Sequence, residues 1–277
     1  MKRLCAILLC ICLLAGCAAK EEASAQTEPT VPAETVELVQ TATQEISYVS
    51  RFDTVTEITL SDDGISVDGA GETDAVYTSH DIIYYEDKDA YESGNPYGEG
   101  EDWEKHTADE AAAHTVVNIT APGAYRVYGK LSQGQIRVDL GEDAYEDPDA
   151  VVELILQNAD ITCTVAPAII FYHVYECGST DNPTKDVDTS AAGANILLAE
   201  GSTNTVHGAY VARIYKPETV VLNEDGTEVE DAKKLHKYDG AVYSKMTMNV
   251  GGEGSLDIFA ENEGLDTELH LTINGGN

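Results

Sequence analysis

The chain has 277 residues and a formal net charge of −34, because 50 acidic side chains stand against only 16 basic ones. Hydrophobic residues make up 43% of the chain, which is enough for a packed core and argues against a disordered protein. A surface this negative repels phosphate backbones and therefore argues against a nucleic-acid partner.

The N-terminus has the pattern of an export signal. Lys2 and Arg3 precede an apolar stretch, residues 4–14, that is too short to span a bilayer comfortably. The sequence LAGC, ending at Cys17, is then similar to the site at which bacterial lipoprotein signals are cut. An ordinary secretory signal is the alternative. We expect residues 1–16 to be removed, Cys17 to be lipidated, and the mature protein to lie outside the cytoplasm, touching the cell membrane only through this lipid.

Residues 17–45 are rich in Ala, Glu, Thr and Pro and contain few large apolar side chains. Such a composition is typical of a flexible tether between a lipid and a folded domain. A single folded domain is predicted over residues 46–277.

Within this domain, short alternating or continuous apolar runs predict β-strands. One stretch, residues 102–114, has a helical composition. Three polar stretches, 86–115, 176–192 and 217–240, are predicted as insertions, the last containing a β-hairpin. The clearest predicted strands cover residues 56–60, 65–67, 123–129, 134–140, 151–161, 195–202, 245–250, 254–258 and 269–273.

The spacing of these strands predicts the fold class. Met246 and Leu269 are 23 residues apart, close to one coil of a parallel β-helix. The longer intervals approach this repeat once the insertions are removed, and a repeat of strand, small-residue corner and strand is typical of a solenoid. We therefore expect an all-β, short, right-handed parallel β-helix with insertions between its coils. The alternative is a β-sandwich, in which hairpin turns would recur throughout the chain.

Six stretches carry a further signal: ITLSDDGISVDGAG at 58–71, APGAYRVYGKLSQGQIRVDLG at 121–141, VVELILQNADIT at 151–162, ILLAEGSTNTV at 196–206, GAVYSKMTMNVGGEGSLDI at 240–258 and NEGLDTELHLTINGG at 262–276. In this order they resemble the bacterial, exported carbohydrate-binding domain-containing proteins of the clostridial type. The resemblance implies a right-handed parallel β-helix like that of polysaccharide lyases. It also implies binding of calcium and of plant polysaccharides.

The excess of acidic side chains favours a calcium site, because hard cations bind several oxygen ligands. The expected ligands lie on a turn between two coils and near the ends of preceding strands. For any one of these residues, a solvated acidic corner is the alternative. The expected Ca²⁺ ligands are Asp160, Glu200, Glu261, Asn262, Glu263, Asp266 and Glu268.

Aromatic side chains are the expected platforms for a glycan. The chain has 15 Tyr but only 3 Phe and 1 Trp, which favours an aromatic side chain with a polar tip. Tyr97 and Trp103 lie in the first insertion, and Tyr172 and Tyr175 lie just before the second. These four side chains are predicted to contact the ligand.

Two cysteines remain in the folded domain. Cys163 and Cys177 follow the signal and the lipidated Cys17, in an exported protein in which a disulfide is permitted. The sequence leaves open whether they form a disulfide or two buried thiols. Neither lies in a CxxC pair, which disfavours a zinc site.

Together these features predict a cell-surface lipoprotein that binds a plant cell-wall or uronate-containing polysaccharide with the assistance of Ca²⁺, without catalytic residues. No GxSxG or HExxH motif is present. A divergent calcium-dependent polysaccharide lyase, using one of the few Arg or Lys residues as its base, stays open as an alternative. So does a surface adhesin or scaffold that recognises protein. The last predicted strand leaves an edge that a partner or a second copy could cover.

Overall fold

The computed structural model describes residues 50–86, 100–101, 103–179, 184–215, 219–226, 229–231 and 234–277. The predicted signal, Cys17 and the whole of the predicted tether lie outside the described residues. Glu45–Asn277 form one compact unit. Within the described ranges, no helix is long and apolar enough to cross a membrane.

The prediction of an all-β protein is confirmed, since strands dominate and helices are short. The one described α-helix, α2 (Ala108–Ala112), lies inside the stretch predicted to be helical. Two short 3₁₀ helices are η1 (Glu142–Glu146) and η2 (Thr189–Ala191). The strands are β1 (Val55–Leu60), β2 (Ser66–Val67), β3 (Val76–Ser79), β4 (Thr115–Ile119), β5 (Gly123–Leu131), β6 (Gly134–Asp139), β7 (Val152–Cys163), β8 (Ile169–His173), β9 (Ala194–Leu198), β10 (Thr203–Gly208), β11 (Val211–Tyr215), β12 (Val221–Leu222), β13 (Val229–Asp231), β14 (Lys234–Tyr238), β15 (Gly240–Ser244), β16 (Met248–Gly252), β17 (Ser255–Ala260), β18 (Glu263–Thr267) and β19 (Leu271–Ile273).

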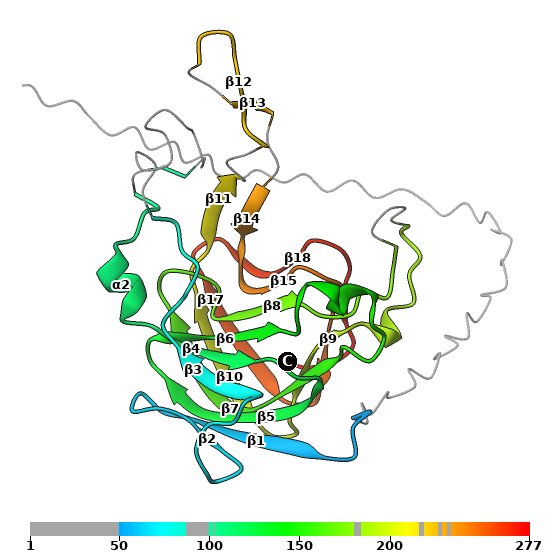
Figure 1. Cartoon of the computed structure of the whole chain (residues 1–277). Coiled ribbons are helices and arrows are strands. Elements are labelled where there is room, and N and C mark those ends of the chain that lie inside the picture. The colour runs from blue at the N-terminus through cyan, green and yellow to red at the C-terminus, as the bar shows by residue number, and fades with distance from the viewer. Residues whose placement is uncertain are drawn as a thin grey trace, which may run out of the picture. The chain divides into compact units, whose positions relative to one another are not determined.

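Most of these strands belong to two large sheets. Sheet A has the order β19-β16-β9-β7-β5-β1-β2, with β10 pairing both β7 and β17, and sheet B has the order β18-β15-β8-β6-β4-β3. All neighbours pair in parallel except β1 with β2 and β3 with β4, which are antiparallel. From β5 onward the chain passes repeatedly from sheet A to sheet B and back (Figure 1). The architecture is therefore one of mixed, mainly parallel sheets.

The core lies between the sheets and is built from rows of register partners. Tyr125, Leu154, Ile196 and Val250 form one such row across four adjacent strands of sheet A. All four are buried. Because side chains alternate along a strand, one residue from each strand adds to the same apolar stack. Neighbouring strands thus share one continuous core.

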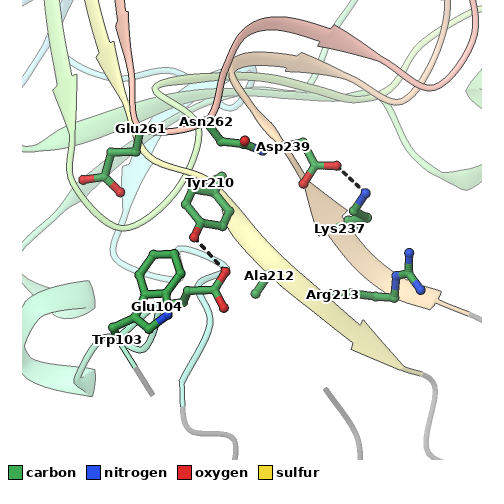
Figure 2. Close-up of a pocket in the computed structure, with 9 residues that line it drawn as sticks. All are labelled: Trp103, Glu104, Tyr210, Ala212, Arg213, Lys237, Asp239, Glu261 and Asn262. Carbon is green, nitrogen blue, oxygen red and sulfur yellow. Dashed lines mark hydrogen bonds and ion pairs between the residues drawn. The ribbon is translucent and has the colours of Figure 1, made fainter. Parts of the chain in front are cut away.

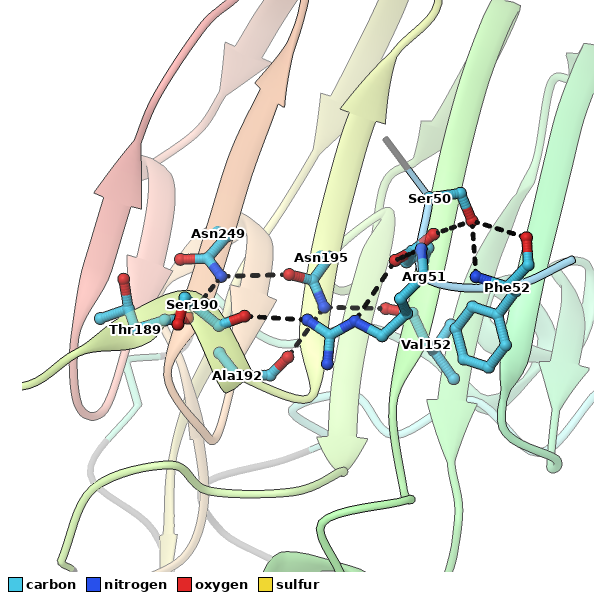
Figure 3. Close-up of polar contacts among 10 residues, drawn as sticks. Ser50, Arg51, Phe52, Val152, Thr189, Ser190, Ala192, Asn195 and Asn249 are labelled. Atoms are coloured by element: carbon cyan, nitrogen blue, oxygen red, sulfur yellow. Dashed lines mark hydrogen bonds and ion pairs between the residues drawn. The ribbon is translucent and has the colours of Figure 1, made fainter. Parts of the chain in front are cut away.

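The outer face of sheet A carries a second, polar row. Glu153, Asn195 and Asn249 are register partners on β7, β9 and β16 and are almost fully buried. The Asn249 amide donates to Asn195 Oδ1 at 3.1 Å and to the Thr189 carbonyl at 2.8 Å (Figure 3). These bonds satisfy polar groups that would otherwise be costly to bury.

Residues 50–52 cover part of this row. The Ser50 hydroxyl donates to Glu153 Oε2 at 2.5 Å, and the Arg51 backbone N–H donates to Glu153 Oε1 at 3.1 Å. The Arg51 guanidinium also donates to the Ser190 carbonyl at 3.0 Å (Figure 3). The start of the described chain is therefore bonded to β7 through the buried Glu153 carboxylate and to η2 through Ser190.

The predicted insertions differ in structure. The third contains β12 and β13, which pair antiparallel, so the predicted hairpin is confirmed. The same stretch also contains β14, which pairs antiparallel with β11. The sequence pattern did not predict this second pair, and in Figure 1 it stands at the end of the large sheets, between them and the β12–β13 hairpin.

Gly252 provides a test of the tight stacking in sheet A. Its φ is +100°, and a Cβ atom there would lie 2.2 Å from the Leu198 carbonyl oxygen on the neighbouring strand. Gly252→Ala is expected to lower the free energy of unfolding by more than about 1 kcal/mol, because both the backbone conformation and the contact disfavour a side chain. Urea denaturation measures this. Gly71→Ala is the control, since no atom lies within 4 Å of its Cβ position; an equal loss in both variants would contradict the explanation.

Candidate functional site

A cleft of about 710 Å³ opens beside β11 and β14. Figure 2 shows Trp103 and Glu104 next to Tyr210, with Lys237, Asp239 and Arg213 on the other side. The cleft therefore combines aromatic, acidic, amide and basic groups from distant parts of the chain. Its lining residues are Trp103, Glu104, Tyr210, Ala212, Arg213, Lys237, Asp239, Glu261 and Asn262.

Trp103 is the most exposed large hydrophobic side chain in the described ranges. It is 76% exposed and is the only tryptophan of the chain. An indole ring held in solvent provides a flat apolar surface beside polar groups, and exposed aromatic residues of this kind are enriched in binding sites. Trp103 is thus the most prominent candidate platform for a ligand.

The floor of the cleft is fixed by a hydrogen bond between distant residues. The Tyr210 hydroxyl donates to Glu104 Oε1 at 2.7 Å, linking positions 106 residues apart in the chain. Burial, together with this bond to a carboxylate, raises the pKa of Tyr210. Tyr210 therefore stays protonated at neutral pH and holds Glu104 in place beside Trp103.

The opposite side of the cleft carries charges of both signs. Lys237 Nζ lies 2.6 Å from Asp239 Oδ2, and Arg213 lines the same wall. Glu261 and Asn262 complete the rim (Figure 2). The lining thus offers both donors and acceptors, which is the requirement for recognising a ligand rich in hydroxyl groups.

The loop that carries Trp103 is anchored to the core by Tyr85. This tyrosine is fully buried and its hydroxyl donates to the Gly100 carbonyl at 3.1 Å. The His106 N–H donates to the Tyr85 carbonyl at 2.9 Å. A Cβ atom at Gly100 would lie 2.4 Å from the Tyr85 ring and 2.8 Å from Ala212 Cβ, so the loop packs closely against β11.

Helix α2 holds the other end of this loop. Thr107 and Glu110 form a capping box at its N-terminus. After the helix, the buried His114 ring accepts a hydrogen bond from the Thr164 N–H at Nε2, 3.2 Å away. Its Nδ1–H donates to the Glu110 carbonyl at 2.8 Å. His114 is therefore a neutral ring that ties the helix to the end of β7.

His114 predicts a pH dependence of stability. Burial lowers its pKa below the ordinary value near 6.5. Below pH 6.5 the unfolded chain binds a proton at His114 before the folded chain does. The contribution of neutral His114 to the free energy of unfolding is therefore complete above pH 6.5 and is lost as the pH falls further. The loss is at most about 1.4 kcal/mol per pH unit. We expect His114→Gln to reduce the loss of unfolding free energy between pH 7.5 and 5.5, measured by urea denaturation. The same loss in both proteins would contradict this assignment.

The four predicted aromatic contacts have different positions. Trp103 lines the cleft, whereas Tyr97 lies outside the described residues. Tyr172 is half-buried, with Lys245 Nζ 5.0 Å from its ring centroid, and it lines a separate cavity of about 50 Å³. Tyr175 is half-buried, and its backbone is bonded to Ala150 and Gly193. The structure thus brings only Trp103 of these four to the cleft.

The predicted metal ligands are also divided. Asp160 forms an ion pair with Lys130 at 2.6 Å, and Glu200 lines a separate hollow of about 240 Å³. Glu261 and Asn262 lie at the cleft. Across the ranges that the structure describes, no group of three or more His, Cys, Asp or Glu is arranged to hold a metal ion. Calcium binding stays a prediction.

Glu263, Asp266 and Glu268 nevertheless share one acidic corner. Burial raises the pKa of Asp266, and the nearby charges of Glu263, Asp239 and Glu268 raise it further. The Tyr243 hydroxyl donates to Glu268 Oε1 at 2.7 Å. The neighbouring carboxylates therefore disfavour a negative charge on Asp266.

Both cysteines of the folded domain are thiols in this structure. Cys163 is buried, and burial raises its pKa to about 12. Cys177 is half-buried, and burial also raises its pKa. The structure therefore has two thiols, of which only Cys163 is buried.

Two of the arginines that could serve as the base of a lyase form ion pairs instead. Arg126 Nη1 lies 2.7 Å from Glu57 Oε1, and Arg137 Nη2 lies 2.9 Å from Asp81 Oδ2. Each of these two strand arginines is thus paired with a carboxylate. Neither arginine lines the cleft.

Tyr210, Arg213, Lys237 and Asp239 were not predicted as site residues. GAYVAR, which contains Tyr210 and Arg213, is similar in sequence to GAVYSK. This similarity does not indicate position, because residues 211–213 belong to β11 whereas residues 240–244 form β15 of sheet B. Nor does it reveal that Tyr210 meets the loop of Trp103.

Fold and cleft together define an all-β protein of mainly parallel strands with an open cleft lined by aromatic and polar side chains. A family model described as "Carbohydrate-binding domain-containing protein" matches residues 113–277, more than half of the chain. The chain belongs to this family. Trp103 and Glu104 lie outside the matched region, whereas the other cleft residues lie within it.

A curated relative from Acetivibrio thermocellus, also described as "Carbohydrate-binding domain-containing protein", is 29% identical over 162 residues. The similarity covers 58% of this chain and 43% of the relative, so the chain spans less than half of the relative's length. No solved structure matches the chain.

Proposed function

We propose that this protein binds polysaccharide without catalysis, and that the ligand occupies the cleft beside Trp103. The observation that carries the proposal is the 76% exposed Trp103 over a cleft lined by carboxylate, amide and basic side chains. Membership of a carbohydrate-binding domain family supports the same class of ligand.

The chemistry of a sugar matches this arrangement. One face of a pyranose ring is formed largely by C–H groups and can lie on the indole of Trp103, as other apolar surfaces do on aromatic rings. The hydroxyls at the ring edge can donate to the carboxylates of Glu104 and Glu261 and accept from Lys237. Because each buried polar group must find a partner, a ligand without hydroxyls would be disfavoured.

We further propose that the stacked sheets form a short right-handed parallel β-helix. The parallel register of β5, β7, β9 and β16, and the passage of the chain from sheet A to sheet B after each repeat, support this winding. Crossovers between parallel strands are right-handed in about 98% of cases, which supports the hand.

The proposal includes Ca²⁺ as a structural or bridging ion. Asp239, Glu263, Asp266 and Glu268 supply carboxylate oxygens, the donor type that calcium prefers. Burial and then the nearby negative charges raise the pKa of Asp266, and a bound cation would offset both effects. Such an ion would neutralise these carboxylates and so let the acidic protein approach a uronate-containing glycan. The LAGC sequence supports a lipid anchor outside the cytoplasm.

Depletion assays test these proposals. The purified mature chain is mixed with insoluble cellulose or pectate in calcium or in a chelator, and the protein left in solution is measured. Depletion by either polysaccharide supports the binding function. Depletion only in calcium supports the role of the ion, and equal depletion in chelator contradicts it. No depletion by either polymer contradicts the binding function, and release of unsaturated uronides absorbing in the near ultraviolet would instead indicate a lyase.

A further inference from the structure

A second hollow of about 270 Å³ lies on the outer face of β7, β10 and β17. Its lining includes Thr162, Thr164, His207, Phe259 and Glu261. Of these five residues, only Glu261 is among the predicted Ca²⁺ ligands, and none is among the predicted aromatic contacts. It presents hydroxyl, imidazole and carboxylate groups around one aromatic ring.

Phe259 is the apolar centre of this hollow. His207 and Phe259 are register partners on β10 and β17, and their rings stack with centroids 4.3 Å apart and planes at 7°. Among the described strands, β17 has only β10 as a neighbour in the sheet. The ring face of Phe259 opposite His207 therefore has no described strand against it, and the side chain is 54% exposed.

Glu261 connects this hollow with the cleft of Trp103, because it lines both. It follows Phe259 by two residues, and its N–H donates to the Gly208 carbonyl at 3.2 Å. That bond holds the backbone of Glu261 against the end of β10, while Tyr210 follows Gly208 by two residues. The two aromatic platforms thus flank one exposed carboxylate, whose backbone is held in place.

We propose that the cleft of Trp103 and the hollow of Phe259 form one track for the internal stretch of a polysaccharide chain. Trp103 would support one sugar ring, and Phe259 stacked on His207 would support a more distant one. Between them, the Glu261 carboxylate would accept hydrogen bonds from sugar hydroxyls. The inference rests on the proposed function and adds the ligand class: a chain of several sugar units, with a mono- or disaccharide filling only part of the track.

The polar lining favours a glycan over a protein partner. Thr162, Thr164 and Glu261 place hydrogen-bonding groups around a single exposed ring, which suits a hydroxylated ligand that stacks one face. A protein interface would require a buried area of roughly 800 Å² per partner with a larger apolar centre. Continuity with the cleft of Trp103 supports the same occupant for both hollows.

Oligosaccharides of defined length test the track. Calorimetry with cello-oligosaccharides and oligogalacturonides of two to six units is carried out on the wild type and on Phe259→Ala, Phe259→Tyr and Trp103→Ala. For the series that binds, the wild type is expected to gain affinity with length. In Phe259→Ala the gain in affinity from the shortest to the longest oligosaccharide should be at least fivefold smaller than in the wild type. Phe259→Tyr should retain the full gain, and Trp103→Ala should weaken binding at every length.

The outcomes separate the two proposals. The track is overturned if the wild-type affinity rises with length but Phe259→Ala binds the hexamer within twofold of the wild type. This result leaves the proposed function standing. A wild type that binds no length of either series overturns both. Tyr145→Ala, at a 38% exposed aromatic residue away from both hollows, is the matched control and should bind every length as the wild type does.

Discussion

Replacement of Trp103 by alanine is expected to weaken polysaccharide binding at least tenfold, which corresponds to about 1.4 kcal/mol. Trp103 is 76% exposed and therefore contributes little to the folded core, so the loss should appear in affinity and not in stability. Exposed tryptophans at the centre of binding sites commonly contribute this much or more. Affinity electrophoresis in gels containing soluble polysaccharide, with urea denaturation in parallel, measures both quantities.

Two controls sharpen this prediction. Trp103→Phe keeps an aromatic face and should retain part of the affinity, whereas Tyr145→Ala removes another exposed aromatic side chain and should retain all of it. Wild-type migration of Trp103→Ala in a gel that retards the wild type would place the ligand elsewhere on the protein.

Replacement of Ile196 by alanine is expected to lower the free energy of unfolding by about 2–5 kcal/mol. Ile196 is fully buried in the central row of sheet A, between Leu154 and Val250. Removal of its side chain leaves a cavity that the stacked strands on both sides cannot readily close. Urea denaturation with linear extrapolation measures the effect.

Ile273→Ala is a closely matched control. Ile273 is the register partner of Val250 on β19 and so belongs to the same row, but it is 60% exposed. Its replacement should cost less than about 0.5 kcal/mol. Equal losses for Ile196→Ala and Ile273→Ala would contradict a core built from this row.

The fold was predictable to the extent that each strand carries its own signal. The runs at residues 123–129 and 151–161 were predicted correctly as strands and form β5 and β7. The run at residues 245–250 was predicted only in part, because residues 245–247 form a turn between β15 and β16. The pairing of β14 with β11 could not be predicted, because β14 has the sequence KLHKY and lies in a polar stretch. Its strand conformation depends on a partner located elsewhere in the chain.

The site was predictable only in part, for a related reason. Trp103 could be identified because a large aromatic residue in a polar loop has no local core to enter. Tyr210 meets that loop, and Asp239 lines the same cleft, only after the strands have stacked. Tyr172 illustrates the converse, since it reads as an outward aromatic residue of β8, yet Tyr238 of β14 packs against it with ring centroids 6.2 Å apart.

Tryptophan fluorescence provides the most direct measurement of the central claim, because Trp103 is the only tryptophan of the chain and lines the cleft. Titration with a soluble polysaccharide that the protein binds should shift the emission to shorter wavelengths and reduce quenching by acrylamide, as the sugar displaces water from the indole. Binding detected by depletion, with emission and quenching unchanged, would contradict a ligand site at Trp103.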